Sequence, residues 1–146
     1  MTLQHQIISE KDLTQLGIDA FIQLGLKPND ARDVVQILVL ADLFGLSTHG
    51  LSRIESYGER LRIGGINPQP QIVVERIASA MVRVNGDNGV GPLVGMRTLE
   101  AAMAVAKDCG IGIALARGSN HFGPISPYAL LAAEQGFATI IGSNAT

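Results

Sequence analysis

Residues 72–84, with the sequence IVVERIASAMVRV, decide the fold class of this chain. Two runs rich in β-branched residues, 72–74 and 81–84, stand on either side of Ala78-Ser79-Ala80. β-Branched residues favour strands, and two such runs around a short turn are typical of an antiparallel pair. The sequence therefore predicts that strands begin near residue 71.

Helical and strand-like segments alternate after this pair. Pro92 is expected in the first turn of a long helix that ends at Gly110. Residues 111–116 and 137–141 are apolar and predict two buried strands, separated by a helix that begins near Ser126. Because the second of these strands has no successor in the sequence, we expect an incomplete sheet with an unpaired edge or an uncovered face.

The residues before the strand pair carry helical patterns. Ser9 is a favourable N-cap for a first helix, which Gly25 ends. A second helix with a broad apolar face opens near Asn29 and ends near Gly45. A third is expected from about His49 to Ile63.

These patterns together predict an α/β (α+β) fold in two parts. Residues 1–65 form an N-terminal helical segment, and residues 71–146 begin a mixed α/β domain. Residues 66–70 contain two prolines and predict an extended linker, because a residue that precedes proline avoids the helical conformation. A chain of 146 residues is long enough for one domain with a hydrophobic core.

The composition excludes several functional classes. Lys and Arg number 11 against 13 Asp and Glu, and aromatic residues make up only 4% of the chain, so nucleic acid is not an expected partner. The apolar run that Asp42 ends is far shorter than the roughly 20 residues of a membrane-spanning helix, so no membrane partner is expected. Cys109 is the single cysteine, and no intrachain disulfide can form. Because Met1–Gln6 lacks the pattern of a secretory signal, we expect a cytoplasmic protein.

The first candidate site lies in the expected third helix. At about 100° per residue, His49, Arg53 and Tyr57 fall in one row beside its apolar face. An imidazole can give or take a proton near neutral pH, a guanidinium grips a carboxylate through two hydrogen bonds, and a phenol can fix a substrate oxygen. Thr48 can cap the helix or hydrogen-bond His49. A solvated polar face explains the same spacing and, from spacing alone, is the more common case.

The second candidate site is the segment Gly118–Ile125, GSNHFGPI, between an expected strand and an expected helix. Backbone N–H groups at a helix N-terminus favour anions such as a cofactor pyrophosphate, and glycines let the backbone approach a ligand closely. His121 could donate to a phosphate or to a reacting oxygen. An ordinary strand-to-helix loop explains the segment equally well.

Other features of the sequence do not indicate a functional site. Residues 85–91, NGDNGVG, differ from G-x-G-x-x-G in glycine order and lack the lysine of a P-loop, so we interpret them as a turn before a helix. His5, His49 and His121 lie far apart in the sequence, and no metal site is predicted. The G-x-S-x-G elbow of serine hydrolases is absent from the sequence.

Several segments resemble the opening of the malate/L-lactate dehydrogenase family, which includes ureidoglycolate and sulfolactate dehydrogenases, diketogulonate reductase and Δ1-piperideine-2-carboxylate reductase. Residues 42–53, DLFGLSTHGLSR, and residues 65–68, GINP, resemble its first signature. Residues 119–123, SNHFG, followed by residues 132–136, AAEQG, resemble its second. Residues 143–146, SNAT, stand where the family often has a Thr-Asn-Thr-like segment.

The resemblance implies an activity and roles for particular residues. It implies NAD(P)-dependent interconversion of 2-hydroxy acids and 2-oxo acids, or reduction of a cyclic imine carboxylate, by a fold that is not the common Rossmann type. It implies that His49 is the proton donor, with Thr48 beside it, and that Arg53 binds the substrate. Tyr57 is assigned to substrate binding together with Arg53. In some members the histidine that matches His121 has the acid/base role instead, and this alternative stays open.

The cofactor implied by the resemblance is NAD or NADP, with a slight preference for NADPH. The residues that match a cofactor-contacting segment are His121, Phe122, Gly123, Pro124 and Ile125. A small carboxylate is the implied substrate, and a homodimer is expected because family members are usually dimers.

The chain departs from the family at three points. Thr48 stands where serine is common, and Pro124 stands where a small residue is frequent. Family chains are also considerably longer, so the cofactor domain is expected to be truncated. The alternative to an enzyme is therefore a catalytically inactive fragment that serves in dimerisation or ligand binding.

Overall fold

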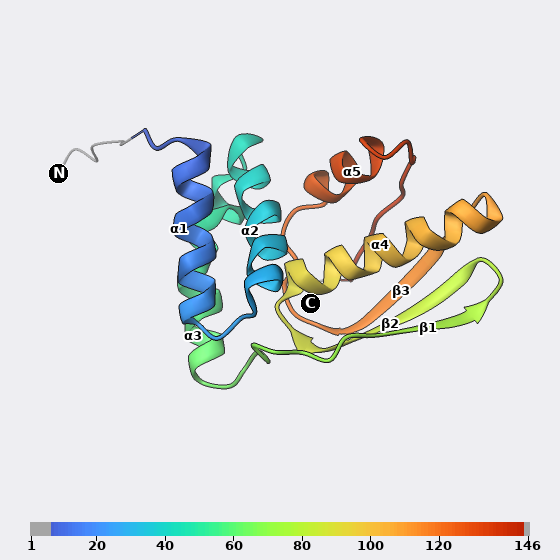
Figure 1. Cartoon of the computed structure of the whole chain (residues 1–146), viewed down its shortest axis with the longest axis horizontal. Coiled ribbons are helices and arrows are strands. Elements are labelled where there is room, and N and C mark those ends of the chain that lie inside the picture. Colours follow the sequence, from blue (N-terminus) through green and yellow to red (C-terminus); the bar gives the residue numbers. More distant parts are fainter. Residues whose placement is uncertain (1–6, 145–146) are drawn as a thin grey trace.

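The computed structural model describes residues 7–144, in which a group of helices packs beside a helix-covered sheet (Figure 1). The expectations about Met1–Gln6 and about Ala145-Thr146 lie outside the described residues. None of the helices within residues 7–144 has the length and apolar character needed to cross a membrane.

Two long helices open the fold. Helix α1 spans Glu10–Gln23 and α2 spans Pro28–Leu43. The Ser9 side chain accepts a hydrogen bond from the Asp12 N–H, which confirms Ser9 as the N-cap. Gly25 follows α1 with φ +97°, a left-handed conformation that favours glycine and ends the helix as expected.

The expected single helix from His49 to Ile63 is wrong. Two short 3₁₀ turns, Ser47–His49 and Leu51–Arg53, come first, and helix α3 spans only Ile54–Arg62. Gly50 separates the two turns with extended backbone angles, φ −86° and ψ −154°. His49, Arg53 and Tyr57 therefore do not form a row on one helix.

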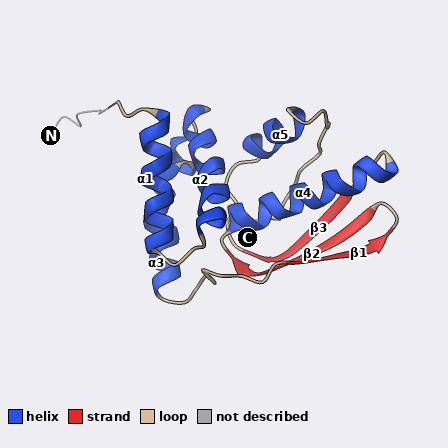
Figure 2. Ribbon diagram, viewed as in Figure 1, coloured by secondary structure: helices blue, strands red, loops and turns tan. Residues whose placement is uncertain are grey.

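The sheet has three strands in the order β1-β2-β3 (Figure 2). Strands β1 (Val73–Ala78) and β2 (Met81–Gly89) are antiparallel, which confirms the expected pair. Helix α4 (Gly91–Cys109) then crosses over to β3 (Ile113–Ser119), which lies parallel to β2. The left-handed Gly110, at φ +77°, ends α4 as predicted.

Three local expectations about the α/β part need correction. Residues 85–89 are not a turn, because β2 continues through them with a register irregularity, while Asp87 and Asn88 adopt positive φ. Residues 137–141 form no strand in the described structure. Strand β3 is not buried: it lies at a sheet edge, and Leu115 is 55% exposed.

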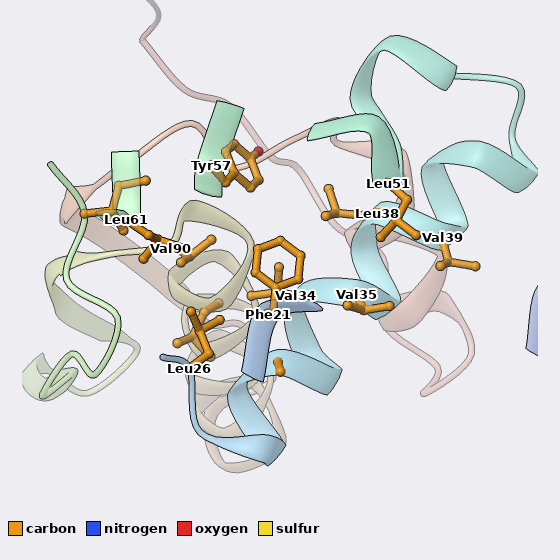
Figure 3. Close-up of a cluster of buried hydrophobic side chains, with 13 residues drawn as sticks. Phe21, Leu26, Val34, Val35, Leu38, Val39, Leu51, Tyr57, Leu61 and Val90 are labelled. Atoms are coloured by element: carbon orange, nitrogen blue, oxygen red, sulfur yellow. The ribbon is translucent and has the colours of Figure 1, made fainter. Parts of the chain in front are cut away.

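Two hydrophobic clusters hold the elements together. The first joins α1, α2 and α3 to the start of α4 and includes Tyr57 (Figure 3). The second joins α2 and α4 to helix α5 (Ser126–Ala133) through residues such as Ile37 and Tyr128. Arg97 of α4 also pairs with Asp33 of α2 at 2.7 Å. These contacts bring the 3₁₀ turns close to the residues that precede α5.

Candidate functional site

Asp42 of α2 fixes the segment from Ser47 to Arg53 through a hydrogen bond. One oxygen of the Asp42 carboxylate accepts a hydrogen bond from the Leu51 N–H at 2.8 Å. The Ser52 hydroxyl adds a bond of 2.9 Å to the Ser47 carbonyl within the segment. Asp42 opens the family-like stretch 42–53 but was not predicted as a site residue, because its partner is nine positions away in a different element.

Thr48, His49 and Arg53 are brought together by two hydrogen bonds within this segment. The Thr48 hydroxyl lies 3.0 Å from Nδ1 of His49. The Arg53 Nε–H donates to the Thr48 carbonyl at 2.7 Å. The predicted contact between Thr48 and His49 is therefore present, and Arg53 lies beside them although the predicted helix does not form.

Tyr57 extends from α3 to the loop before α5. Its side chain is buried, with 4% exposed, and its hydroxyl lies 2.8 Å from His121 Nδ1 and 3.2 Å from the His121 carbonyl oxygen. Burial raises the pKa of the Tyr57 phenol to about 12, although the positive charge of Arg53 opposes this shift. The phenol therefore keeps its proton at neutral pH. A contact of Tyr57 with substrate stays a prediction.

The two histidines singled out in the sequence lie side by side. The ring centroids of His49 and His121 are 5.5 Å apart. Partial burial lowers the pKa of His121, and the nearby positive charges of Arg53 and His49 lower it further. The two candidate sites of the sequence thus form one cluster, with His49, Arg53 and Tyr57 on one side and His121 on the other.

The backbone around His121 is fixed by close approach to the start of α4. The Asn120 side chain donates to the Gly89 carbonyl at 2.9 Å and to the Asn88 side chain at 3.0 Å. A β-carbon on Gly91 would collide with the His121 carbonyl, so only glycine fits at this position. Asn120 lies in the predicted Gly118–Ile125 segment but was given no role there, and Gly91 was not predicted as a site residue; the role of each follows from this tertiary contact.

The remaining predicted cofactor residues continue from His121 to α5. Phe122 and Pro124 are half-buried, Ile125 is exposed, and Gly123 has φ +83°. The Tyr128 hydroxyl donates to the Phe122 carbonyl. No side chain within residues 7–144 caps the N-terminus of α5, so its first N–H groups have no side-chain acceptor there.

Other surface features lie away from this cluster. A hollow of about 480 Å³ contains none of the predicted site residues; its lining includes Asp30, Pro70, Ile72 and Arg97. Residues 7–144 contain no group of three or more His, Cys, Asp or Glu side chains arranged to hold a metal ion. The histidine cluster is therefore the part of the described structure in which the predicted functional side chains meet.

Comparison with known proteins identifies the family. The profile of malate/L-lactate dehydrogenases matches residues 8–146. The chain belongs to this family. The malate/L-lactate dehydrogenase relatives include a malate dehydrogenase of Pyrococcus horikoshii, 43% identical over 84% of this chain, and an L-sulfolactate dehydrogenase of Methanocaldococcus jannaschii, 34% identical over 94%. A ureidoglycolate dehydrogenase (NAD(+)) of Escherichia coli is 33% identical over 91% of the chain.

Solved malate/L-lactate dehydrogenase structures share the fold. The malate dehydrogenase of Pyrococcus horikoshii superimposes with a TM-score of 0.87 over 92% of this chain, at 38% identity. The Δ1-piperideine-2-carboxylate reductase of Pseudomonas syringae pvar. tomato gives 0.82 over 90%, at 30% identity. These matches confirm the resemblance stated from the sequence and the mixed α/β class.

The matched region is a minor part of each relative. The chain spans 34% of the length of the Pyrococcus horikoshii malate dehydrogenase and 40% of the Methanocaldococcus jannaschii enzyme. The complete relatives therefore contain residues that have no counterpart in this chain.

Proposed function

We propose that this chain supplies the proton-transfer and carboxylate-binding side of an NAD(P)-dependent oxidoreductase site. The reaction is the interconversion of 2-hydroxy acids and 2-oxo acids, or the reduction of a cyclic imine carboxylate. The observation that carries the proposal is the meeting of His49 and His121, with ring centroids 5.5 Å apart, beside Arg53. Such a cluster offers a proton donor and a fixed positive charge to one small anionic molecule.

Arg53 is the proposed carboxylate-binding residue. Its Nε–H is engaged by the Thr48 carbonyl, while its two terminal nitrogen atoms have no hydrogen-bond partner within residues 7–144. The engaged Nε fixes the plane of the guanidinium, and the free nitrogen atoms can still donate to a carboxylate. An arginine that is oriented before binding loses less side-chain entropy when the substrate arrives.

His49 is the proposed proton donor to the developing oxygen or nitrogen of the substrate. The Thr48 hydroxyl at 3.0 Å from Nδ1 orients the imidazole, and this supports a role for Nε2 in proton transfer. Burial and the neighbouring positive charges lower the pKa of His121 and disfavour its protonated form, which favours His49 as the donor. Assignment of the acid/base role to His121 is the alternative that mutation can test.

The proposed cofactor is NAD or NADP, with a slight preference for NADPH, held by residues 121–125. When bound, such a cofactor supplies or accepts the hydride of the reaction. The segment fits an anionic group, because the uncapped N-terminus of α5 lies at its end and Gly123 has no β-carbon to obstruct approach. Relatives named as an NAD(+) enzyme and an NADP(+) enzyme occur among the matches.

Two further proposals concern the oligomeric state and the location of the protein. We propose that the protein works as a homodimer in the cytoplasm. The second candidate function is a catalytically inactive chain that serves only in dimerisation or ligand binding.

The experiment has two arms. The chain itself is titrated with NADH and NADPH by fluorescence, then assayed for their oxidation with a panel of 2-oxo acids and Δ1-piperideine-2-carboxylate. In parallel, this chain replaces the matching segment of the Pyrococcus horikoshii malate dehydrogenase. Turnover by the chimera with a 2-oxo acid supports the enzyme, while a folded chimera that binds cofactor without any turnover supports the second candidate.

A further inference from the structure

The Tyr57 hydroxyl contacts His121 at two atoms, and this geometry restricts which atoms carry the protons. One phenolic oxygen lies near two different atoms of the same residue, 2.8 Å from Nδ1 and 3.2 Å from the carbonyl oxygen. Residues 57 and 121 come from different elements, and the side chain of Tyr57 is almost completely buried. The hydroxyl therefore has a fixed position against His121.

A single proton on the phenol limits how these two contacts can be satisfied. A carbonyl oxygen only accepts, so a hydrogen bond to it must use the Tyr57 proton. The Tyr57 oxygen is then free to accept from Nδ1–H of the imidazole. If the phenol instead donated to Nδ1, its oxygen would face the His121 carbonyl at 3.2 Å with no proton between the two acceptors. Only the first arrangement makes both contacts hydrogen bonds.

We propose that Tyr57 is a positioning residue that holds neutral His121 as the Nδ1–H tautomer, with the lone pair on Nε2. The inference rests on the proposed function for its chemical meaning. In this tautomer Nε2 can accept a hydrogen bond from the hydroxyl of a 2-hydroxy acid, whereas an Nε2–H could not. The hydrogen bond at one ring nitrogen thus sets what the other can do.

Several observations support this arrangement. Burial raises the pKa of the Tyr57 phenol to about 12, so the phenol keeps the proton that it donates to the His121 carbonyl. Within residues 7–144, Nε2 of His121 has no hydrogen-bond partner, so nothing there competes with a ligand for its lone pair. His49 is held in a comparable way, because its Nδ1 also lies beside a hydroxyl, that of Thr48. The neighbouring positive charges of Arg53 and His49 disfavour protonation of His121 and so preserve the acceptor.

The test is a direct measurement of the tautomer in the 146-residue chain. Uniformly ¹⁵N-labelled protein is examined by long-range ¹H–¹⁵N correlation NMR at about pH 8, above the ordinary pKa of histidine. Protonated and unprotonated ring nitrogens differ widely in ¹⁵N shift, so each tautomer is recognised from its pattern. We expect His121 to show a protonated Nδ1 and an unprotonated Nε2. The Nε2–H tautomer in the unsubstituted chain would overturn the inference without any variant.

Variants separate the hydroxyl from the ring that carries it. Tyr57→Phe keeps the buried ring but removes the acceptor of Nδ1–H, and it should shift His121 toward the Nε2–H tautomer. Tyr128→Phe is the matched control: it removes the other buried phenolic hydroxyl, which bonds the Phe122 carbonyl, and should leave the His121 pattern unchanged. A folded Tyr57→Phe chain with an unchanged pattern contradicts the inference. Because the readout requires neither cofactor nor turnover, its failure is distinct from failure of the proposed activity.

Discussion

The Asp42 carboxylate occupies the space into which a β-carbon at Gly50 would project, and it also accepts the Leu51 N–H bond. Gly50 has no positive φ, so close approach and not backbone strain requires glycine there. We expect Gly50→Ala to displace the carboxylate and to cost about 1–3 kcal/mol, the usual range for overpacking. Urea unfolding measures this cost. Gly142→Ala, at a position with open space around it, is the control and should cost much less.

His49→Ala should lower turnover in the chimera by about 10²–10⁴-fold, the usual contribution of a general acid. Cofactor affinity should barely change, because His49 lies outside the predicted cofactor segment. Steady-state kinetics with a 2-oxo acid, together with NADPH titration, separate the two effects. Turnover near that of the unsubstituted chimera would transfer the donor role to His121.

Arg53→Lys should raise KM for carboxylate substrates. Lysine retains the charge but has neither the Nε–H that bonds the Thr48 carbonyl at 2.7 Å nor the paired terminal donors of arginine. The exposed Arg62→Lys makes the same chemical change away from the cluster and should leave KM unaltered. Equal KM values for the two variants would mean that Arg53 is an ordinary surface residue.

Gly123→Val should weaken NAD(P)H binding if residues 121–125 contact the cofactor. At φ +83° a valine also strains the backbone, so stability must be controlled separately. Gly136→Val provides this control, because Gly136 has φ +84° and nothing within 4 Å of its β-carbon position, and it lies beyond the loop. Cofactor titration should distinguish the two variants. Equal affinities in folded proteins would remove the loop from the site.

Because the pKa of His121 is lowered in the folded state, we expect the free energy of unfolding to depend on pH. A base whose pKa is lower in the folded state binds fewer protons there than in the unfolded chain, so acid favours unfolding. The stability that neutral His121 preserves is complete above its ordinary pKa of 6.5 and is lost as the pH falls through the folded-state value. His121→Gln should therefore reduce the fall in unfolding free energy on acidification from pH 7. Identical pH dependence in urea titrations would contradict this assignment.

Local sequence signals predicted most of the elements. Ser9 caps α1 with its own side chain, Gly110 ends α4 in the left-handed conformation, and the β-branched runs around Ser79 form the antiparallel pair. In each case the interactions that define the boundary involve residues close in sequence. Such signals can be recognised in a short stretch of sequence without knowledge of the tertiary structure.

The segments that were predicted wrongly are those whose structure depends on residues distant in the sequence. Periodicity alone continues a helix through Gly50, but the Asp42 carboxylate fixes that position in an extended conformation. Residues 137–141 have strand-like composition, yet they make no ladder with the described strands. Strands require partners, so composition by itself is a weak predictor of them.

The candidate site was predicted as two separate motifs and is one cluster in the structure. His49, Arg53 and His121 were each singled out by residue type and by family resemblance. Their meeting depends on α2, α4 and α5 packing together, and on the Tyr57 contact with a residue 64 positions away. No spacing rule within one element can anticipate such a contact.

His49 and His121 are proposed to serve one substrate site. A double-mutant cycle in the chimera tests it most directly, with His49→Ala, His121→Ala and the double variant assayed for NADPH oxidation with a 2-oxo acid. If both imidazoles act on one bound substrate, each single variant loses most of the turnover and the double variant loses within about tenfold of the more damaging single one. Losses that multiply independently, or a single variant with full turnover, would contradict the claim.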